Sequence, residues 1–416
     1  MTAGSVVSGA LSAALFGMVC VRGVRAALTD LRPGEDPAPE LPKRRTQWGI
    51  FFGLLAWEAA VLLLLFVLRM ALGHGRDIRK FLEFLTCADG QHYMAIAEDW
   101  YLREGSVDRL VQLVFLPGYP LAVRAAALLT GDTLYGGLLV SWLCFPAAGT
   151  VLYRLALLDT DPPAALRTVR FLCLMPGAFF FVTPMSESLF LLLSLGCVYL
   201  ARREKWLPAC LLGGLAAFTR SLGLVLVVPA GYELLRVFLR RERRFSGRIA
   251  VRWAALLLIP AGFGAYCLIC REVSGDAFQW AIYQREHWHQ SPGLFFGTAA
   301  YQTRYALEGL AEEEYRTALG LWFPNLLCAF GALSAAALAS NRLRPGYTAY
   351  FLAYFALAMG ATWLLSAPRY LLVLFPAAMA LAELTRDRRC DILIAVPMAG
   401  AGVLYTLLFA ARWQVW

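Results

Sequence analysis

Long apolar stretches recur along almost the whole 416-residue chain, and they constrain the fold more than any other feature of the sequence. Most of them approach the roughly 20 residues that a helix needs to cross a bilayer. Charged residues make up only 16% of the chain, against about 25% in a typical soluble domain. We therefore predict an all-α polytopic membrane protein with about 11–13 transmembrane helices. The apolar runs lie at about residues 5–21, 47–72, 115–130, 133–157, 168–184, 186–201, 206–219, 221–239, 249–270, 319–339, 347–365, 369–385 and 391–411.

The positions of the cations predict the orientation of the chain in the membrane. The net charge is +9, and nearly all of the cations are arginine, which suggests a GC-rich, bacterial genome. They cluster in short loops between apolar runs, which argues against nucleic-acid binding and follows the positive-inside rule. The segments expected on the cytoplasmic side hold Lys43 to Arg45, Arg202 and Arg203, Arg240 to Arg244, Arg342 and Arg344, and Arg386, Arg388 and Arg389.

Two longer, net acidic stretches fall on the opposite, outer side of the expected single domain 1–416. The first outer loop, 73–132, would hold re-entrant or juxtamembrane helices, and the second is 271–318. If 115–130 crossed the membrane, the arginine-flanked segment 158–168 would fall outside, so we interpret 115–130 as re-entrant or surface-lying. The chain shows no internal repeat, which argues against a repeat-based transporter.

The first candidate for chemistry is residues 88–101 in the first outer loop. Asp89 is expected to cap a short helix, with His92 one turn along the same face. A carboxylate at the membrane surface could accept a proton from a substrate hydroxyl. The alternatives stay open: Asp89 as a plain helix cap, His92 as a packed histidine, and Glu98 as part of a solvated helix flank.

Two further candidates lie where apolar runs are interrupted. Glu187 follows a proline-marked break, where it could favour a helix N-terminus or contact a sugar or a site arginine. Arg220 and Arg369 suit a phosphate group, and the alternative is that they snorkel to the interface. We expect these positions to converge with the first outer loop on one face.

Two acidic features invite other interpretations. The sequence Glu286-His287-Trp288-His289 has too few ligands to predict a metal site, and sugar stacking or interfacial anchoring by Trp288 is favoured. Glu58 lies in the middle of an apolar run, where an acid indicates either a functional site or a polar contact to another helix.

Six short motifs, in order along the chain, resemble those of the PIG-V (GPI mannosyltransferase 2-like) family of the GT-C glycosyltransferase superfamily. They are Asp89-Gly90-Gln91-His92-Tyr93 with Ile96-Ala97-Glu98, Phe115-Leu116-Pro117-Gly118-Tyr119-Pro120-Leu121, Pro176 to Phe180 with Ser186 to Phe190, Thr219-Arg220-Ser221-Leu222-Gly223, Phe278 with Gln284 and Trp288, and Pro368-Arg369-Tyr370. Two positions depart from the family pattern: Ala88, where Trp is common, and Leu222, where Asn is common.

The resemblance implies a GT-C-type fold and an inverting transfer of a sugar, mannose in the family, from a polyprenyl- or dolichyl-phosphate donor to a lipid-linked or glycan hydroxyl. Asp89 would be the catalytic base. The implied substrate-binding residues are His92, Tyr93, Glu98, Glu187, Arg220, Gln284, Trp288, Arg369 and Tyr370. No metal, nucleotide or other cofactor is expected.

The expected location is a bacterial plasma membrane with the site facing outside, or the lumenal face of the endoplasmic reticulum in a eukaryote. The alternative is a multi-pass transporter or flippase for a lipid-linked sugar.

Overall fold

The structure of the chain, a computed structural model, describes residues 3–32, 43–101, 112–242 and 246–415. In these ranges the regular elements are helices, with one isolated β-bridge between Pro292 and Ala361. The prediction of an all-α chain is confirmed. Residues 102–111 of the first outer loop, together with Arg243 and Arg244, lie outside the described residues.

The helices follow one another along the chain with few long connections. They are α1 Ala3–Asp30, α2 Arg44–Ala71, α3 Ile78–Phe84, α4 Asp89–Asp99, α5 Gly118–Thr130, α6 Thr133–Ala156, α7 Pro162–Leu174, η2 Ala178–Val182, α8 Glu187–Arg202, α9 Trp206–Thr219, η3 Ser221–Leu226, α10 Val227–Val237, η4 Phe238–Glu242, α11 Gly247–Ala255, α12 Leu258–Ser274, α13 Gln279–Trp288, α14 Phe295–Ala311, α15 Tyr315–Thr317, η5 Ala318–Trp322, α16 Phe323–Ala339, α17 Pro345–Ala358, α18 Ala367–Leu372, α19 Phe375–Leu384 and α20 Arg388–Ala410.

Seven helices or continuous runs of two or three helical elements in the described part of the chain are long and apolar enough to cross a bilayer. The other apolar runs form shorter helices, such as α8, α9, α17 and α19, or pairs of helices separated by a break. Irregular backbone at membrane depth is tolerated where protein covers it, and the breaks around η2 and α18 are indeed buried. The chain is a multi-pass membrane protein, as predicted.

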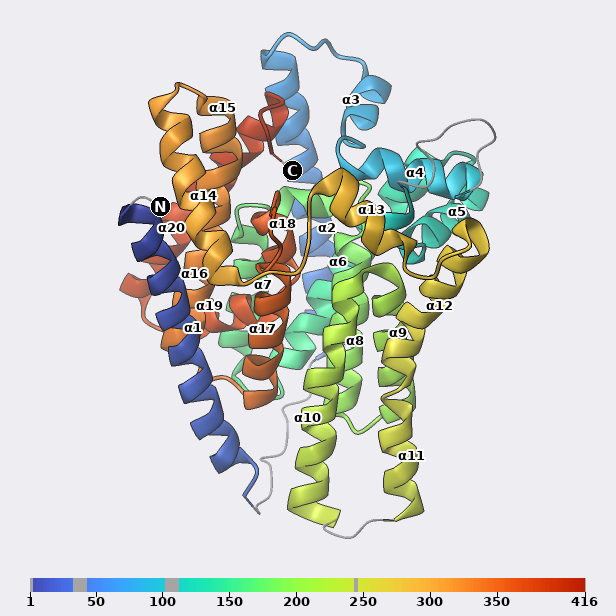
Figure 1. Ribbon diagram of the computed structural model, residues 1–416, viewed down its shortest axis with the longest axis vertical. Helices are drawn as coiled ribbons and strands as arrows, with labels where there is room; N and C mark the ends of the chain where they lie inside the picture. Colours follow the sequence, from blue (N-terminus) through green and yellow to red (C-terminus); the bar gives the residue numbers. More distant parts are fainter. Residues whose placement is uncertain (1–2, 33–42, 102–111, 243–245, 416) are drawn as a thin grey trace.

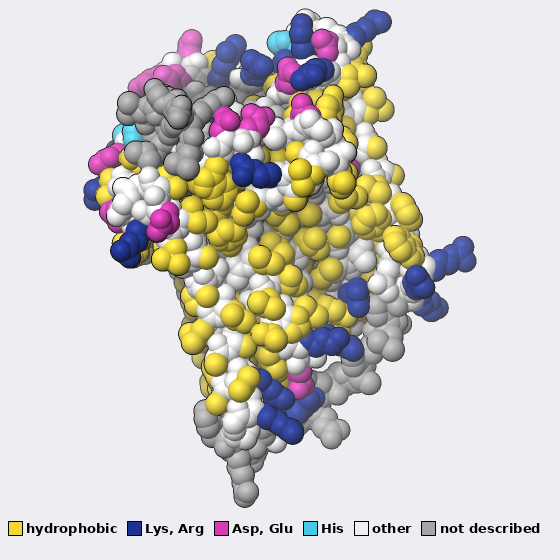
Figure 2. Space-filling view, turned by 90° about the vertical axis from the view of Figure 1, so that its right-hand side faces the viewer, with side chains coloured by type: hydrophobic (Ala, Val, Ile, Leu, Met, Phe, Trp, Pro, Cys, Tyr) yellow, Lys and Arg dark blue, Asp and Glu magenta, His cyan; other side chains and the backbone are white. Residues whose placement is uncertain are grey.

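The two ends of the helix bundle differ in charge. In Figure 1, α3, α4, α5, α13 and α15 lie towards the top, and the C-terminal end of α10 and the start of α11 lie towards the bottom. Figure 2 shows a hydrophobic belt between the ends, with Asp and Glu gathered towards the top and mainly Lys and Arg towards the bottom. We call these the α4 end and the arginine-rich end.

Helix α5 corresponds to the apolar run 115–130. It has 13 residues, which at 1.5 Å each give about 20 Å, well short of the roughly 30 Å hydrocarbon core. It lies beside α4 at the α4 end (Figure 1). Its mid-run Arg124 donates hydrogen bonds to the carbonyl oxygens of Ala97 and Glu98, at the C-terminal end of α4. These features favour the juxtamembrane interpretation of this segment.

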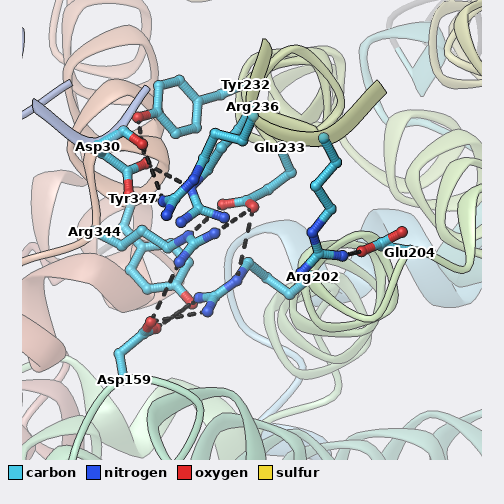
Figure 3. Close-up of polar contacts among 11 residues, drawn as sticks. Asp30, Asp159, Arg202, Glu204, Tyr232, Glu233, Arg236, Arg344 and Tyr347 are labelled. Carbon is cyan, nitrogen blue, oxygen red and sulfur yellow. Dashed lines mark hydrogen bonds and ion pairs between the residues drawn. The ribbon is translucent and has the colours of Figure 1, made fainter. Parts of the chain in front are cut away.

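A cluster of buried ion pairs joins four helices at the arginine-rich end (Figure 3). Its strongest contacts are Arg202 to Asp159 at 2.6 Å, Arg344 to Glu233 at 2.6 Å, and Arg236 to Asp30 at 2.8 Å. These residues lie on α1, α8 and α10, in the turn after α6 and, for Arg344, at the N-cap position of α17. Because each buried arginine has a carboxylate partner, the cluster fastens these segments without leaving an uncompensated charge.

Candidate active site

Four helix termini meet at the α4 end and bring four charged side chains into one network. Asp89 is the first residue of α4, Glu187 the first of α8, Arg220 follows α9, and Arg369 lies in α18. These positions are up to 280 residues apart in the sequence. The predicted convergence of the polar interruptions is therefore present in the structure.

Asp89 lies at the accessible edge of this network. Its Oδ2 accepts a hydrogen bond from Nη2 of Arg369 at 2.7 Å, and 33% of its side chain is exposed. The prediction that Asp89 caps the helix is wrong, because Ala88 occupies the cap position and Asp89 begins the helix. Ala88 has φ 58° and ψ −128°, a conformation that costs about 1–3 kcal/mol for a non-glycine residue. Strain of this kind is concentrated at functional sites, and here it directly precedes Asp89.

Glu187 lies at the centre of the network and is completely buried. Its Oε1 accepts hydrogen bonds from Nη1 of Arg220 at 2.7 Å and from Nε and Nη2 of Arg369 at 2.9 and 2.7 Å. Of the two roles left open by the sequence, the structure supports contact with site arginines. Because the carboxylate lies between the two guanidinium groups, we assign Glu187 a positioning role.

Neither arginine snorkels towards the interface. Arg369 is only 4% exposed, and its guanidinium lies 5.3 Å from the centre of the Phe180 ring. Arg220 lies 5.4 Å from the centre of the Tyr370 ring. The aromatic faces and Glu187 hold both guanidinium groups in fixed orientations, which suits recognition of a phosphate.

The hydroxyl of Ser186 links α4 to the arginines. It lies 3.1 Å from the Tyr93 hydroxyl and accepts a hydrogen bond from Nη1 of Arg220 at 3.1 Å. Ser186 therefore does not use its side chain as a helix cap, although it occupies the cap position. Burial raises the pKa of Tyr93, so this phenol remains a hydrogen-bond donor at neutral pH.

An aromatic stack beside Asp89 brings in the second outer loop. His92 stacks on Phe115 with ring centres 4.7 Å apart, and Phe115 makes an edge contact with Trp288 of α13 at 5.8 Å. Burial lowers the pKa of His92, although the Asp89 carboxylate acts in the opposite direction. The imidazole is therefore neutral at pH 7, next to the candidate base.

Two predicted substrate-binding residues lie away from the network. Glu98 is two and a half turns along α4 from Asp89, where it is exposed and accepts a hydrogen bond from Thr133. Gln284 bonds to Gln290 within its own loop. Neither residue has a hydrogen bond or ion pair to the four charged groups in the described part of the chain. Glu98 matches the solvated helix flank that the sequence also allowed, and the substrate-binding role of Gln284 stays a prediction.

Glu58 and the possible metal ligands are the remaining acidic candidates. Glu58 is buried, and neither of its carboxylate oxygens has a hydrogen-bond partner among the described residues. The polar contact to another helix that the sequence suggested is therefore not made. No group of three or more His, Cys, Asp or Glu side chains in the described ranges could hold a metal ion.

Glycines bring the site motifs into contact. A side chain on Gly118 would place its Cβ 2.4 Å from Oγ1 and 2.8 Å from Cα of Thr219, so only glycine lets α5 reach the end of α9. Similarly, a Cβ on Gly177 would lie 3.3 Å from Pro368. Each contact joins two motifs that the sequence analysis identified separately.

Residues 76–270 match the family model described as mannosyltransferase (PIG-V). The predicted resemblance is confirmed over this segment. It includes Asp89, Glu187 and Arg220 and ends before Arg369, which the structure adds to the same site. The match supports a glycosyltransferase.

Among solved structures, the chain is similar to ArnT from Cupriavidus metallidurans, whose crystal structure is bound to undecaprenyl phosphate. The sequence identity is 15% and the TM-score 0.49, and the alignment covers 87% of this chain and 76% of that chain. No curated protein matches the chain.

Sequence reasoning missed three contributors to the site. In the sequence, Ser186 appears only as the first residue of a motif, whereas its hydroxyl joins Tyr93 to Arg220. Phe115 and Phe180 pack against His92 and Arg369 respectively. Both phenylalanines lie in recognised motifs, which could have indicated that they belong to the site. An aromatic residue in an apolar run does not reveal, however, which side chain it will contact.

Proposed function

We propose that the chain is an inverting mannosyltransferase that transfers mannose from a polyprenyl-phosphate donor to a hydroxyl of a lipid-linked or glycan acceptor. The observation that carries the proposal is the network of Asp89, Glu187, Arg220 and Arg369, three of whose members lie in the segment matching the mannosyltransferase family. It combines an accessible carboxylate with two buried arginines at one end of a membrane helix bundle.

Asp89 acts as the general base in this mechanism. Its carboxylate removes the proton of the acceptor hydroxyl as the oxygen attacks the anomeric carbon of mannose. The acceptor oxygen attacks from the face opposite the bond between that carbon and the phosphate oxygen. This bond breaks as the new one forms, which inverts the configuration. The leaving polyprenyl phosphate develops negative charge, which Arg369 and Arg220 stabilise. The leaving group holds this charge itself, so the reaction needs no metal ion or nucleotide.

The ion pair between Asp89 and Arg369 suggests how donor binding activates the base. Nη2 of Arg369 donates to both Asp89 and Glu187, each at 2.7 Å. A donor phosphate competes with Asp89 for this guanidinium, because it carries the same charge. Glu187 keeps Arg369 in place during the exchange. The released carboxylate then has both oxygens available for the acceptor hydroxyl.

The proposed orientation places the site on the non-cytoplasmic side of the membrane. The positive-inside rule assigns the arginine-rich end to the cytoplasm. The four charged groups lie at the opposite end, with α4 (Figure 1). For a bacterial chain this is the outer face of the plasma membrane.

The decisive experiment measures transfer of radiolabelled mannose from synthetic polyprenyl-phosphate mannose to a membrane lipid extract. Purified wild type should produce a labelled product, and Asp89→Asn should reduce its formation at least about 10³-fold because the base is lost. The Asn variant should still bind the donor, since both arginines and Glu187 remain. Glu98→Gln serves as the control, because Glu98 is an exposed acid on the same helix.

Each result has a direct meaning. Loss of transfer with retained donor binding assigns the base role to Asp89. An active Asp89→Asn enzyme would refute that role. If wild type instead moves the intact lipid-linked sugar across vesicle membranes without cleaving it, the transporter alternative replaces the proposal.

A further inference from the structure

Arg154, Arg203 and Lys205 lie close together at the arginine-rich end, and none of them makes an ion pair with a described residue. Arg154 lies on α6, and Arg203 and Lys205 lie in the turn between α8 and α9. The neighbouring arginines of Figure 3 behave differently, since Arg202 binds Asp159 and Arg344 binds Glu233. Other exposed cations at this end, such as Arg248 and Arg389, also lack an ion pair within the described part of the chain, but Arg154, Arg203 and Lys205 differ from them because they share one cavity.

These three cations line one cavity, together with apolar side chains. The cavity has a volume of about 480 Å³, within the range typical of ligand sites, and lies between α6, α8 and α9. Its apolar wall is formed by Val151, Leu192, Leu193, Leu200 and Leu212. The adjacent α9 residues Leu207, Leu211 and Leu215 are about half exposed, as expected for a surface facing lipid tails.

Arg154 carries an unsatisfied donor at this site. Its Nη2 donates to the Tyr199 hydroxyl at 3.0 Å, and its guanidinium lies 4.8 Å from the centre of the Tyr199 ring. Its Nε is buried and has no hydrogen-bond partner among the described residues. A buried donor without a partner is unfavourable, and an anionic oxygen would satisfy it.

We propose that this cavity binds an anionic phospholipid of the surrounding bilayer leaflet. The phosphate lies among Arg154, Arg203 and Lys205, and one acyl chain occupies the apolar cavity between α6, α8 and α9. The combination of a cationic rim and an apolar wall at the membrane surface matches a lipid with a charged headgroup better than it matches a soluble anion. The site lies at the opposite end of the bundle from Asp89, so it is independent of the proposed transfer reaction.

The test is native mass spectrometry of the purified full chain with phosphatidylglycerol or phosphatidylcholine in detergent. Wild type should retain one phosphatidylglycerol and bind phosphatidylcholine at least about tenfold more weakly. Arg203→Gln combined with Lys205→Gln should weaken phosphatidylglycerol binding at least about tenfold. The matched control, Arg248→Gln combined with Arg389→Gln, removes two exposed charges elsewhere at the same end and should bind like wild type.

A second variant tests the apolar part of the site separately. Leu193→Trp adds bulk to the cavity wall and keeps all three cations, so it should also lose the lipid. Asp89→Asn should retain it, which separates this proposal from the proposed function. Equal loss in both double variants would show non-specific attraction and overturn the site. Displacement of the lipid by millimolar inorganic phosphate would also overturn it, as would binding of polyprenyl phosphate where phosphatidylglycerol does not bind.

Discussion

Glu187 holds two buried arginines with a single carboxylate oxygen, and this makes it the most constrained side chain of the site. Glu187→Gln would leave Arg220 and Arg369 buried without their shared counter-charge. Breaking a buried ion pair in this way typically costs about 3–5 kcal/mol. We expect a lower melting temperature in detergent together with loss of mannose transfer, measured on the same preparation.

Glu98 provides the matched comparison at the same end of the molecule. It is exposed, and its carboxylate contacts Thr133 rather than an arginine. Glu98→Gln should change stability by less than about 1 kcal/mol and leave transfer near the wild-type rate. Equal losses in Glu98→Gln and Glu187→Gln would contradict the positioning role assigned to Glu187.

His92 gives a pH dependence of defined sign. Burial lowers its pKa from the ordinary value of 6.5. As the pH falls below that value, the unfolded chain takes up the proton before the folded chain does, so acidification destabilises the fold. His92→Phe keeps a ring against Phe115 and removes the titration. Between about pH 7.5 and 5.5, wild type should therefore lose more in melting temperature than this variant. An equal loss in both would show that His92 does not titrate differently on folding.

At the scale of elements, the site depends on how closely helix ends approach one another. Gly118 begins α5 against the end of α9, where a Cβ would come within 2.8 Å of the Thr219 backbone. Gly118→Ala should destabilise the chain by about 1–3 kcal/mol. It should also impair transfer, because Arg220 directly follows Thr219. Thermal unfolding and the transfer assay together measure both effects.

The control for this substitution is another helical glycine. Gly17 lies in α1, with nothing within 4 Å of the position of an added Cβ. Gly17→Ala should leave transfer intact and change stability by no more than about 1 kcal/mol, in the favourable direction. Similar losses in both variants would mean that alanine is disfavoured for a reason other than the contact with α9.

The sequence predicted which segments interrupt the apolar runs but not how they make contact. Asp89, Glu187, Arg220 and Arg369 were all identified, because a charge next to a membrane span is rare enough to be noticed. Their pairing depends on helix packing and on the strained backbone of Ala88, neither of which has a local pattern. Glu98 lies nine residues after Asp89, so helical spacing places it on the opposite face of α4, but only the structure shows that it contacts Thr133 of α6.

At the scale of the whole molecule, hydropathy predicted a helical membrane protein because a bilayer-spanning backbone must satisfy its own hydrogen bonds. It could not predict the lateral arrangement of the helices, since lipid-facing and buried apolar residues look alike in sequence. Arg202 and Arg344, which were expected on one side, do meet at one end (Figure 3). Charge counting did not show, however, that Arg202 and Arg344 are neutralised by Asp159 and Glu233.

The orientation itself can be tested by labelling single cysteines in intact cells with a membrane-impermeant maleimide. Glu98 is exposed at the α4 end and Arg203 at the arginine-rich end. In a Cys390→Ser background, which removes the exposed native thiol, Glu98→Cys should react in intact cells. Arg203→Cys should react only after permeabilisation, because arginine-rich loops remain in the cytoplasm. Labelling of both cysteines from the same side would contradict the assignment of the two ends to opposite sides of the membrane. Labelling of Arg203→Cys alone in intact cells would place the Asp89 network in the cytoplasm, where a different pool of donors and acceptors would reach it.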